Sequence, residues 1–401
     1  MAAKLGLSRG MRLLATCDLK NRPDSLQVML HQGHAFVSHP FTGGFSVLDI
    51  RDPRKPEPVT YVPPPPGTRT LHLQLSDGIL LVTNEADNSA SEKYLDKAQY
   101  FGQQLGQDTG GLEEFSAGVR VYDVSDPARP RAAGFLPIPG FGTHRLWWDG
   151  GPLATASSMP LGYDDFILSV LDMKDPLKPE LIGHWAPDAQ PARGRMGLHH
   201  AILDGTLAYG AWRAGGLQIV DTQGGQLTYV GGLTPGAWGG GNTHTTLPLP
   251  GRNLVVLADE SVQDHQADGL RKIWLLDVAD RGQPTILSAL PEPAALDFRA
   301  MDGVFGPHNL HENRPGTWRS EELIFATYQN AGVRAYDISE PEAPREVAFC
   351  VPPPPARNVD PRAGGALVPQ SADLVVSPEG LIVASDLNAG ISLIQYETSK
   401  P

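Results

Sequence analysis

The chain has 401 residues, of which 41% are hydrophobic and 19% charged, so it can bury a sizeable core and does not have a disordered composition. Its formal net charge is −13 and it has no Lys/Arg-rich run, which argues against nucleic acid as a partner. No apolar run approaches about 18 residues, and Met1–Lys20 lacks the features of a secretory signal. We therefore expect a soluble, cytoplasmic protein with no membrane partner.

Glycine and proline punctuate the whole chain and predict many short strands joined by turns. The 44 glycines and 37 prolines recur at intervals rather than in one block, which favours an all-β fold. Cys17 and Cys350 are too few for a disulfide framework and are not spaced as a metal-binding pair, so we expect two buried thiols.

The first predicted strand, Met11–Leu19, reads MRLLATCDL and precedes an internal repeat. Each copy of the repeat has an apolar pair, Asp, an apolar residue, a short polar step and usually Pro, as in VYDVSDPARP from Val121. We expect the repeat aspartates to form turns by accepting nearby backbone N–H groups. They are Asp49, Asp123, Asp172, Asp221, Asp277 and Asp337.

Gly-bearing turns and apolar strands precede each copy, and a further strand follows the Asp-Pro turn. Such four-stranded units predict a seven-bladed β-propeller, a single domain over 1–401. The last unit, Leu374–Tyr396, has three strands only. The N-terminal strand matches the missing fourth strand, so we expect it to pair with Ile391–Tyr396 and remove an open edge.

The longest insertion of the chain, residues 85–118, lies in the second predicted blade. It contains SEKYLDKAQYFGQQL, whose apolar spacing predicts one amphipathic helix of about four turns. The connection between second and third strands lies on one face of the ring, so this insertion is predicted to be a lid over that face. A homo-oligomer contact is the alternative.

The repeated strands LQIVD, VLDI and VYDV resemble the LVIVD-repeat family, and the resemblance covers nearly the whole chain. It implies a β-propeller. The repeat fixes no activity, because function depends on the site that a fold carries.

Five histidines share one position at the start of the predicted inner strands. Inner strands line the central channel, so their imidazoles can converge on one ion, and imidazole suits zinc, copper, iron or nickel. The shared position predicts a divalent transition metal, with Fe, Cu, Zn and Mn left open. The alternatives are hydrogen-bonding links between blades and a metal-free histidine site. The five candidates are His72, His144, His199, His244 and His308.

Polar residues beside the predicted ligands could orient them or bind substrate. Gln27 and Asp373 occupy the histidine position in the first and last blades, and Arg145, His200 and His311 adjoin it. For His200 and His311 a place in the core is an equally open alternative. Arginines also gather in the connections on this face, where they could steer an anionic substrate. They are Arg69, Arg145, Arg193, Arg195, Arg299, Arg357 and Arg362.

Side chains at the ends of the second strands are candidates for acid, base or substrate anchor. Those singled out as catalytic are Glu85, Arg213, Glu260 and Tyr328, with Asp259 and Asp386 in equivalent places.

We expect a metal-dependent enzyme acting on a small anionic or carbonyl-bearing molecule at the histidine-lined channel mouth. At the level of fold and site the chain looks similar to carotenoid-cleavage oxygenases and to selenium-binding or methanethiol oxidase proteins, which implies an oxidoreductase. A metal-dependent hydrolase or lyase is the second possibility. A non-catalytic propeller scaffold for a protein partner is the third.

Overall fold

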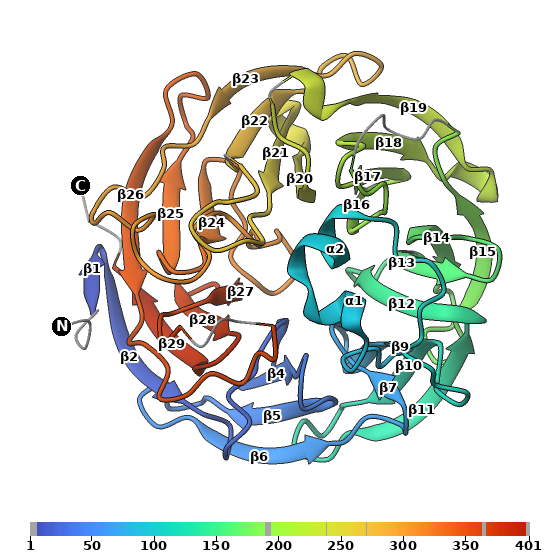
Figure 1. The fold of residues 1–401 in the computed structure, drawn as a ribbon, viewed down its shortest axis with the longest axis horizontal. Coiled ribbons are helices and arrows are strands. Elements are labelled where there is room, and N and C mark those ends of the chain that lie inside the picture. Colours follow the sequence, from blue (N-terminus) through green and yellow to red (C-terminus); the bar gives the residue numbers. More distant parts are fainter. Residues whose placement is uncertain (1–5, 189–193, 238, 270, 363–365, 398–401) are drawn as a thin grey trace.

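The computed structural model describes residues 6–188, 194–237, 239–269, 271–362 and 366–397. Strands dominate these residues, as the composition predicts, and Figure 1 shows them arranged in a ring around a centre. The helical elements in the described ranges are short: α1 (Glu92–Leu95), α2 (Lys97–Gly102), and the 3-10 turns η1 (Gln223–Gly225), η2 (Pro235–Ala237) and η3 (Pro250–Arg252).

Three four-stranded antiparallel sheets come from consecutive strands. They are β3 (Val28–His31), β4 (His34–Ser38), β5 (Phe45–Asp49), β6 (Glu57–Val62); β16 (His200–Asp204), β17 (Leu207–Ala211), β18 (Leu217–Asp221), β19 (Thr228–Leu233); and β20 (Thr243–Leu249), β21 (Leu254–Asp259), β22 (Ile273–Asp277), β23 (Thr285–Ala289).

Nine further strands form one sheet, which contains two such units joined by a single residue pair, Gly142 with Glu85. Its strands are β7 (Thr68–Arg69), β8 (Leu73–Ser76), β9 (Ile79–Ala86), β10 (Gly118–Asp123), β11 (Arg131–Pro137), β12 (Gly140–Trp147), β13 (Leu153–Pro160), β14 (Ile167–Asp172) and β15 (Glu180–Trp185).

The two remaining sheets each take a strand from the N-terminal part of the chain. β2 (Met11–Cys17) pairs with β29 (Gly390–Tyr396), which confirms the predicted pairing, and β28 (Leu381–Asp386) and β27 (Ser371–Val376) complete that sheet. β1 (Leu7–Arg9) pairs with β26 (Arg345–Val351), outside β25 (Val333–Asp337) and β24 (Leu323–Thr327). The sequence analysis did not anticipate β1.

Six of the units carry the same β-bulge, directly before the repeat aspartate. The register shifts between Val47 and Leu48, and between Val121 and Tyr122, and likewise before each of the other aspartates. Each repeat aspartate accepts the backbone N–H of the residue two positions on, as predicted for a turn-forming residue. The sequence repeat is thus a repeat of backbone geometry.

Apolar side chains fill the spaces between neighbouring sheets. Phe36 and Val47 pack on Leu73 and Leu80 of the next unit. Hydroxyl groups of second strands link neighbours as well: Ser38 Oγ donates to the Leu71 carbonyl, and Ser385 Oγ donates to the Leu26 carbonyl. Because the last link joins the final sheet to the first, the ring is closed.

The insertion between β9 and β10 is built differently from the prediction of one helix. It contains α1 and α2, separated at Asp96, whose extended backbone (φ −91°, ψ 100°) ends the first helix. The Asp96 side chain accepts from Gln99 N and caps the second, so local capping outweighs continuation of the amphipathic pattern. Glu85 also belongs to β9 rather than to the insertion.

Both cysteines are free thiols. Cys350 is buried, and burial raises the pKa of its thiol to about 11, whereas Cys17 is half-buried. No helix in the described part of the chain is both long and apolar enough to span a bilayer.

Candidate metal centre

The structure brings the five histidines together at the centre of the ring. The ring centroids of His72, His144 and His199 lie 5.1–6.1 Å apart. His199 stacks on His244 at 3.6 Å, and His244 lies 4.5 Å from His308. Four of the five lie within or directly before the first strand of their unit, and His308 lies two residues before the isolated bridge of Leu310 with Ala326. The shared sequence position thus becomes shared space.

Every one of the five imidazoles is held through Nδ1. Four of these nitrogens face acceptors: Gln27 Oε1 for His72 (3.2 Å), Glu85 Oε2 for His144 (3.2 Å), the His244 carbonyl for His199 (2.9 Å) and the Ala372 carbonyl for His308. His244 Nδ1 contacts Thr245 Oγ1 at 3.0 Å. An imidazole whose Nδ1 donates presents the lone pair of Nε2, which is how histidine usually binds a metal.

Burial favours the neutral form of four of the five imidazoles. Desolvation, assisted by Arg145, holds the pKa of His72 well below its usual range, and desolvation with neighbouring imidazoles does the same for His199 and His244. The pKa of His144 is also lowered by burial, although Glu85 opposes the shift. Neutral imidazole is the form that binds a metal, so the donor set fits a transition metal.

Two groups within the described residues have ligand atoms within 4.8 Å of one another. One is His72, His144 and His199, and the other is His244, Glu260 and His308. The first group is buried, the second is buried except for the half-buried His308, and both could hold a metal ion. His199 and His244 are stacked, so the two groups adjoin.

Two carboxylates adjoin the histidines. Glu85 is ion-paired with Arg69, and Glu260 Oε1 lies 3.4 Å from His308 Nε2. Burial acts to raise both carboxyl pKa values, but the net effect is a lowering, chiefly through Arg69 at Glu85 and through His308 at Glu260. Both side chains are therefore anions at neutral pH.

The insertion covers the histidine pocket. Tyr94 of α1 and Tyr100 and Phe101 of α2 line a cavity of about 620 Å³ together with the five histidines, Glu260 and Arg213. Figure 1 places both helices over the centre of the ring. Tyr94 and Tyr100 also pack with Phe141 and Phe166 of the ring, so the cover is anchored in an apolar cluster.

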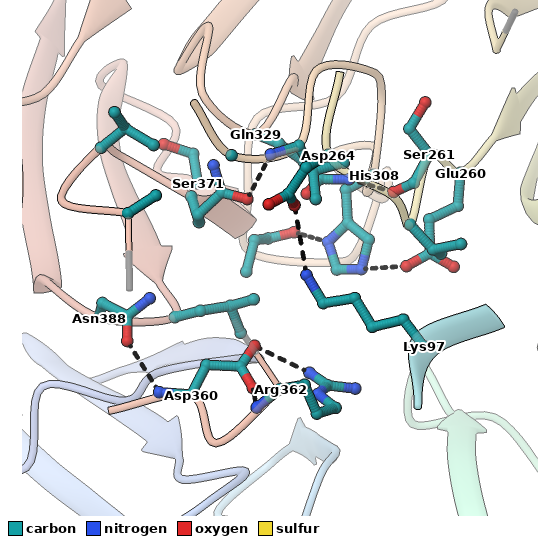
Figure 2. A pocket seen from close by; sticks show the side chains of 18 of the residues that line it. Lys97, Glu260, Ser261, Asp264, His308, Gln329, Asp360, Arg362, Ser371 and Asn388 are labelled. Atoms are coloured by element: carbon teal, nitrogen blue, oxygen red, sulfur yellow. Dashed lines mark hydrogen bonds and ion pairs between the residues drawn. The ribbon is translucent and has the colours of Figure 1, made fainter. Parts of the chain in front are cut away.

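A second cavity, of about 640 Å³, adjoins the first and shares Phe101, Glu260, His308 and Arg362 with it. Figure 2 shows Lys97 reaching from α2 across this cavity toward Asp264, which it meets at 3.4 Å. This ion pair is partly exposed and links the insertion to the connection after β21. The side cavity therefore gives the histidine pocket a polar approach at the edge of the lid.

A further buried polar layer lies next to the ring but does not line its cavity. Arg145 donates to Asn309 Oδ1 (2.8 Å) and Glu312 Oε1 (3.2 Å), and His200 Nδ1 lies 3.4 Å from the same glutamate. Burial, with Glu312 nearby, raises the pKa of Asp373 to about 7. Of the predicted supporting residues, Gln27 contacts a ring histidine directly, while Arg145, His200 and Asp373 belong to this layer.

Two predicted site residues lie elsewhere. Tyr328 does not line either cavity; it is buried in an apolar cluster, with its ring 5.2 Å from Phe305. His311 Nε2 contacts the Trp318 carbonyl at 2.8 Å and packs on Phe325, so it serves the core. Both residues lie near the predicted place along the chain, but their side chains pack in the core instead of lining the histidine cavity.

The predicted arginines also divide into residues that lie at or near the histidine cavity and residues that lie elsewhere. Arg69 and Arg362 line the histidine cavity, and Arg195 is buried against Asp165. Arg299 and Arg357 are directed to surface contacts with Glu292 and the Asn21 carbonyl. Arg193 lies outside the described residues.

Sequence reasoning missed several residues that the structure places near the site. The aromatic residues of the lid were assigned to a helix but not to the cavity. Asn309 and Glu312 were overlooked, although they adjoin His308 and His311 in GPHNLHE and alternation along an inner strand would have directed one set of side chains inward.

Comparison with protein-family models and with curated proteins finds no match. Solved structures do share the fold. A "putative 6-phosphogluconolactonase" from Bacteroides uniformis aligns with a TM-score of 0.56 at 11% identity, over 84% of this chain and 88% of its own. A functionally unknown protein from Desulfotomaculum acetoxidans aligns with a TM-score of 0.51 at 11% identity, over 86% and 89%. Identities this low support a common fold alone.

Proposed function

We propose that the protein is a metal-dependent enzyme that acts on a small organic molecule in the histidine cavity. The observation that carries the proposal is that five imidazoles are each fixed through Nδ1 while their rings converge; His72, His144, His199 and His244 are buried and kept neutral by burial, and His308 is half-buried. Histidines that only link strands would need no such convergence. The divalent transition metal is Fe, Cu, Zn or Mn.

His72, His144 and His199 are the preferred ligands in this proposal. Gln27 and Glu85 orient the first two, and such outer contacts raise ligand basicity. His244 and His308 then flank the ion together with Glu260. A bound ion of this kind supplies either a redox change or Lewis acidity.

The residues of this chain supply the remaining functions. Tyr94, Tyr100 and Phe101 exclude water above the site, which strengthens the electrostatic interactions below them. Arg213 and Glu260 are placed to bind and orient the substrate, which we propose to be anionic or carbonyl-bearing. Glu85 acts through His144 and Arg69, and is a positioning residue rather than a catalytic one.

An oxidoreductase of oxygenase type is the favoured reaction class, because the donor set is dominated by imidazole and the cavity is covered by aromatic side chains. A metal-dependent hydrolase or lyase is the second candidate. It is favoured by Glu260, an ionised carboxylate 3.4 Å from His308 Nε2 that could accept a proton. A non-catalytic scaffold requires no lid over neutral imidazoles, so it is the weakest of the three.

The architecture that we propose for this site is a seven-bladed β-propeller with LVIVD-type repeats. Dividing the nine-stranded sheet at the single Gly142–Glu85 pair gives two units, and with the other five sheets this makes seven. The six equivalent bulges support a common repeat.

Elemental analysis of the purified protein by plasma mass spectrometry tests the proposal. We expect near-stoichiometric transition metal in the wild type and its loss in His72→Ala/His144→Ala, with unchanged far-ultraviolet dichroism. The matched control His34→Ala/His265→Ala removes two histidines outside the cavity and should retain the metal. Oxygen consumption against a panel of small acids and carbonyl compounds separates an oxygenase from a hydrolase. A metal-free wild type, or a double variant that keeps its metal, would contradict the proposal.

A further inference from the structure

The buried arginines around the histidine cavity are almost all paired with carboxylates. Arg69 is paired with Glu85, Arg195 with Asp165 at 2.6 Å, and Arg362 with Asp360 at 3.0 Å. In the adjoining polar layer, Arg145 and Arg314 share Glu312 at 3.2 and 2.6 Å. Each of the three cations around the cavity therefore has a carboxylate of its own, whereas Arg145 and Arg314 share one, and pairing with a carboxylate is what burial of a guanidinium requires.

Arg213 is the exception among these described residues. It lines the histidine cavity and is 4% exposed, yet its nearest carboxylate oxygen, on Glu260, is 3.8 Å away. Within the described residues, the one hydrogen bond of its side chain runs from Nη1 to the amide oxygen of Asn242 at 2.9 Å. Its buried Nε has no hydrogen-bond partner. This guanidinium therefore keeps a donor that no described residue satisfies, in a side chain that lines the histidine cavity.

The environment of Arg213 calls for a negative charge. Burial, then repulsion from Arg195, lowers the pKa of its guanidinium to about 10, so its charged form is less stabilised than usual. Glu260 compensates it weakly, because its nearest carboxylate oxygen is 3.8 Å from Nη1. A buried donor left without an acceptor costs free energy that a bound anion would recover.

The backbone fixes where this guanidinium lies. Arg213 has a left-handed conformation (φ 38°), and its N–H and carbonyl pair with Thr243, the residue before His244. The same turn in another unit carries Gln329, also left-handed (φ 41°) and bridged to Ser371. Gln329 is neutral and donates to the Ser261 carbonyl. The turn therefore forms with a neutral side chain at this position, so the backbone conformation does not explain why residue 213 is a cation.

We propose that Arg213 anchors the carboxylate of a small monocarboxylic acid, which specifies the substrate class of the proposed enzyme and in that respect rests on the proposed function. A planar carboxylate matches the free edge of a guanidinium and can accept two N–H groups from it. One cation without a matched carboxylate favours a single negative charge over a phosphate dianion. The cavity that Arg213 lines is also lined by the five histidines, so an acid held by Arg213 would lie beside them.

Phe101 of the lid lies beside Arg213. The Arg213 guanidinium carbon lies 5.8 Å from the centre of the Phe101 ring, on the lid helix α2. Phe101 also lines the side cavity, so an acid entering past Lys97 would pass from one cation to the next. The carboxylate would then be held at Arg213 with the remainder of the molecule directed at the histidines.

Isothermal titration with propionate tests the inference, in parallel on protein as purified and on protein stripped by a chelator. We expect propionate to bind the wild type and propionamide, its neutral isostere, not to bind. Arg213→Gln, which copies the residue of the equivalent turn, should weaken propionate binding by at least about tenfold. The matched control Arg334→Lys alters a buried arginine paired with Glu346 outside the cavity and should bind as the wild type does.

The thermal stability of Arg213→Gln also shows whether Arg213 has only a structural role. Removing a poorly compensated buried charge should leave the thermal midpoint unchanged or raise it, whereas a structural role predicts a fall. Unaltered propionate affinity in Arg213→Gln would overturn the inference, as would tighter Arg213-dependent binding of inorganic phosphate. The metal content of the wild type as purified separates the two proposals: Arg213-dependent binding in a protein that is purified without metal supports this inference and contradicts the metal centre, and metal without such binding does the reverse.

Discussion

Individual residues in the buried polar layer determine how the protein responds to pH. Asp373 occupies the same inner-strand position as the histidines, but its carboxyl is enclosed with Arg145 and Glu312 nearby. Burial raises its pKa from 3.8 to about 7. Arg145 acts in the opposite direction by stabilising the carboxylate, but its effect on the pKa is smaller than that of burial. The carboxyl is accordingly protonated over much of the range in which exposed aspartates are ionised.

Asp373→Asn is expected to stabilise the protein at pH 8. The folded pKa is above the unfolded one, so the contribution of Asp373 to stability is fully present below the unfolded pKa and is lost as pH rises from 3.8 through about 7. Asparagine copies the protonated form. Urea denaturation should show a gain of about 1–4 kcal/mol at pH 8 and a flatter pH profile.

The exposed repeat aspartate Asp221 provides the comparison, since Asp221→Asn should produce no such gain. A destabilised Asp373→Asn protein at pH 8 would show that the carboxylate is ionised and compensated in the fold.

At the scale of elements, the lid is the part whose form depends most on local capping. α1 and α2 are too short to be stable alone, and each begins with a side-chain cap, Ser91 for the first and Asp96 for the second. Tyr94 and Tyr100 hold the pair onto the apolar cluster with Phe141. The cover thus combines weak local structure with a firm apolar attachment.

Asp96→Ala is expected to loosen α2 without unfolding the ring. Loss of a helix N-cap costs about 0.5–2 kcal/mol, and here the cost should remain local because the sheets do not depend on this turn. Hydrogen–deuterium exchange should rise over residues 92–102. Under the proposed function, turnover of an identified substrate should also fall while the metal is retained.

Asp126→Ala supplies a matched change, because Asp126 accepts Ala128 N–H in an exposed turn between β10 and β11, outside the lid. Equal exchange over the lid in both variants, or a collapse of the whole exchange profile in Asp96→Ala, would contradict this account.

For the whole molecule, the N-terminal strands complete the ring. β2 covers the edge of β29, and β1 covers the edge of β26, so two sheets depend on the first 17 residues. Met11 also packs with Phe325, Val333 and Ile394, which ties the two sheets to one core. Closure therefore comes from opposite ends of the sequence.

Nested truncations are expected to lower stability in two steps. Removal of residues 1–10 takes away β1 and leaves β26 as an edge, at a cost on the order of 1 kcal/mol for each ladder hydrogen bond lost. Removal of residues 1–17 also exposes β29 and the core around Met11, and should cause aggregation. Thermal denaturation with light scattering measures both, and equal midpoints for the two truncations would refute this role of β2.

Much of the backbone followed from the sequence alone. The repeat of apolar pair, Asp and turn predicted the strands and the aspartate turns, because strand period and turn chemistry depend on neighbouring residues. The pairing of Met11–Cys17 with the last sheet followed from the repeat as well, because the last unit lacks a fourth strand. The shared position of the five histidines likewise predicted their convergence, since equivalent residues of a closed repeat meet at its centre.

The tertiary structure alone decided which neighbouring side chains join the site. Tyr328 and Glu260 follow equivalent strands, yet Tyr328 packs in the core and Glu260 contacts His308. The difference arises because the surroundings of a side chain depend on the adjacent sheet as well as on its own strand. Arg213 was one candidate among several until the carboxylate partners of the other buried arginines were known. Charge compensation is a property of three-dimensional proximity, and the sequence positions of these pairs, such as Arg195 with Asp165, do not encode it.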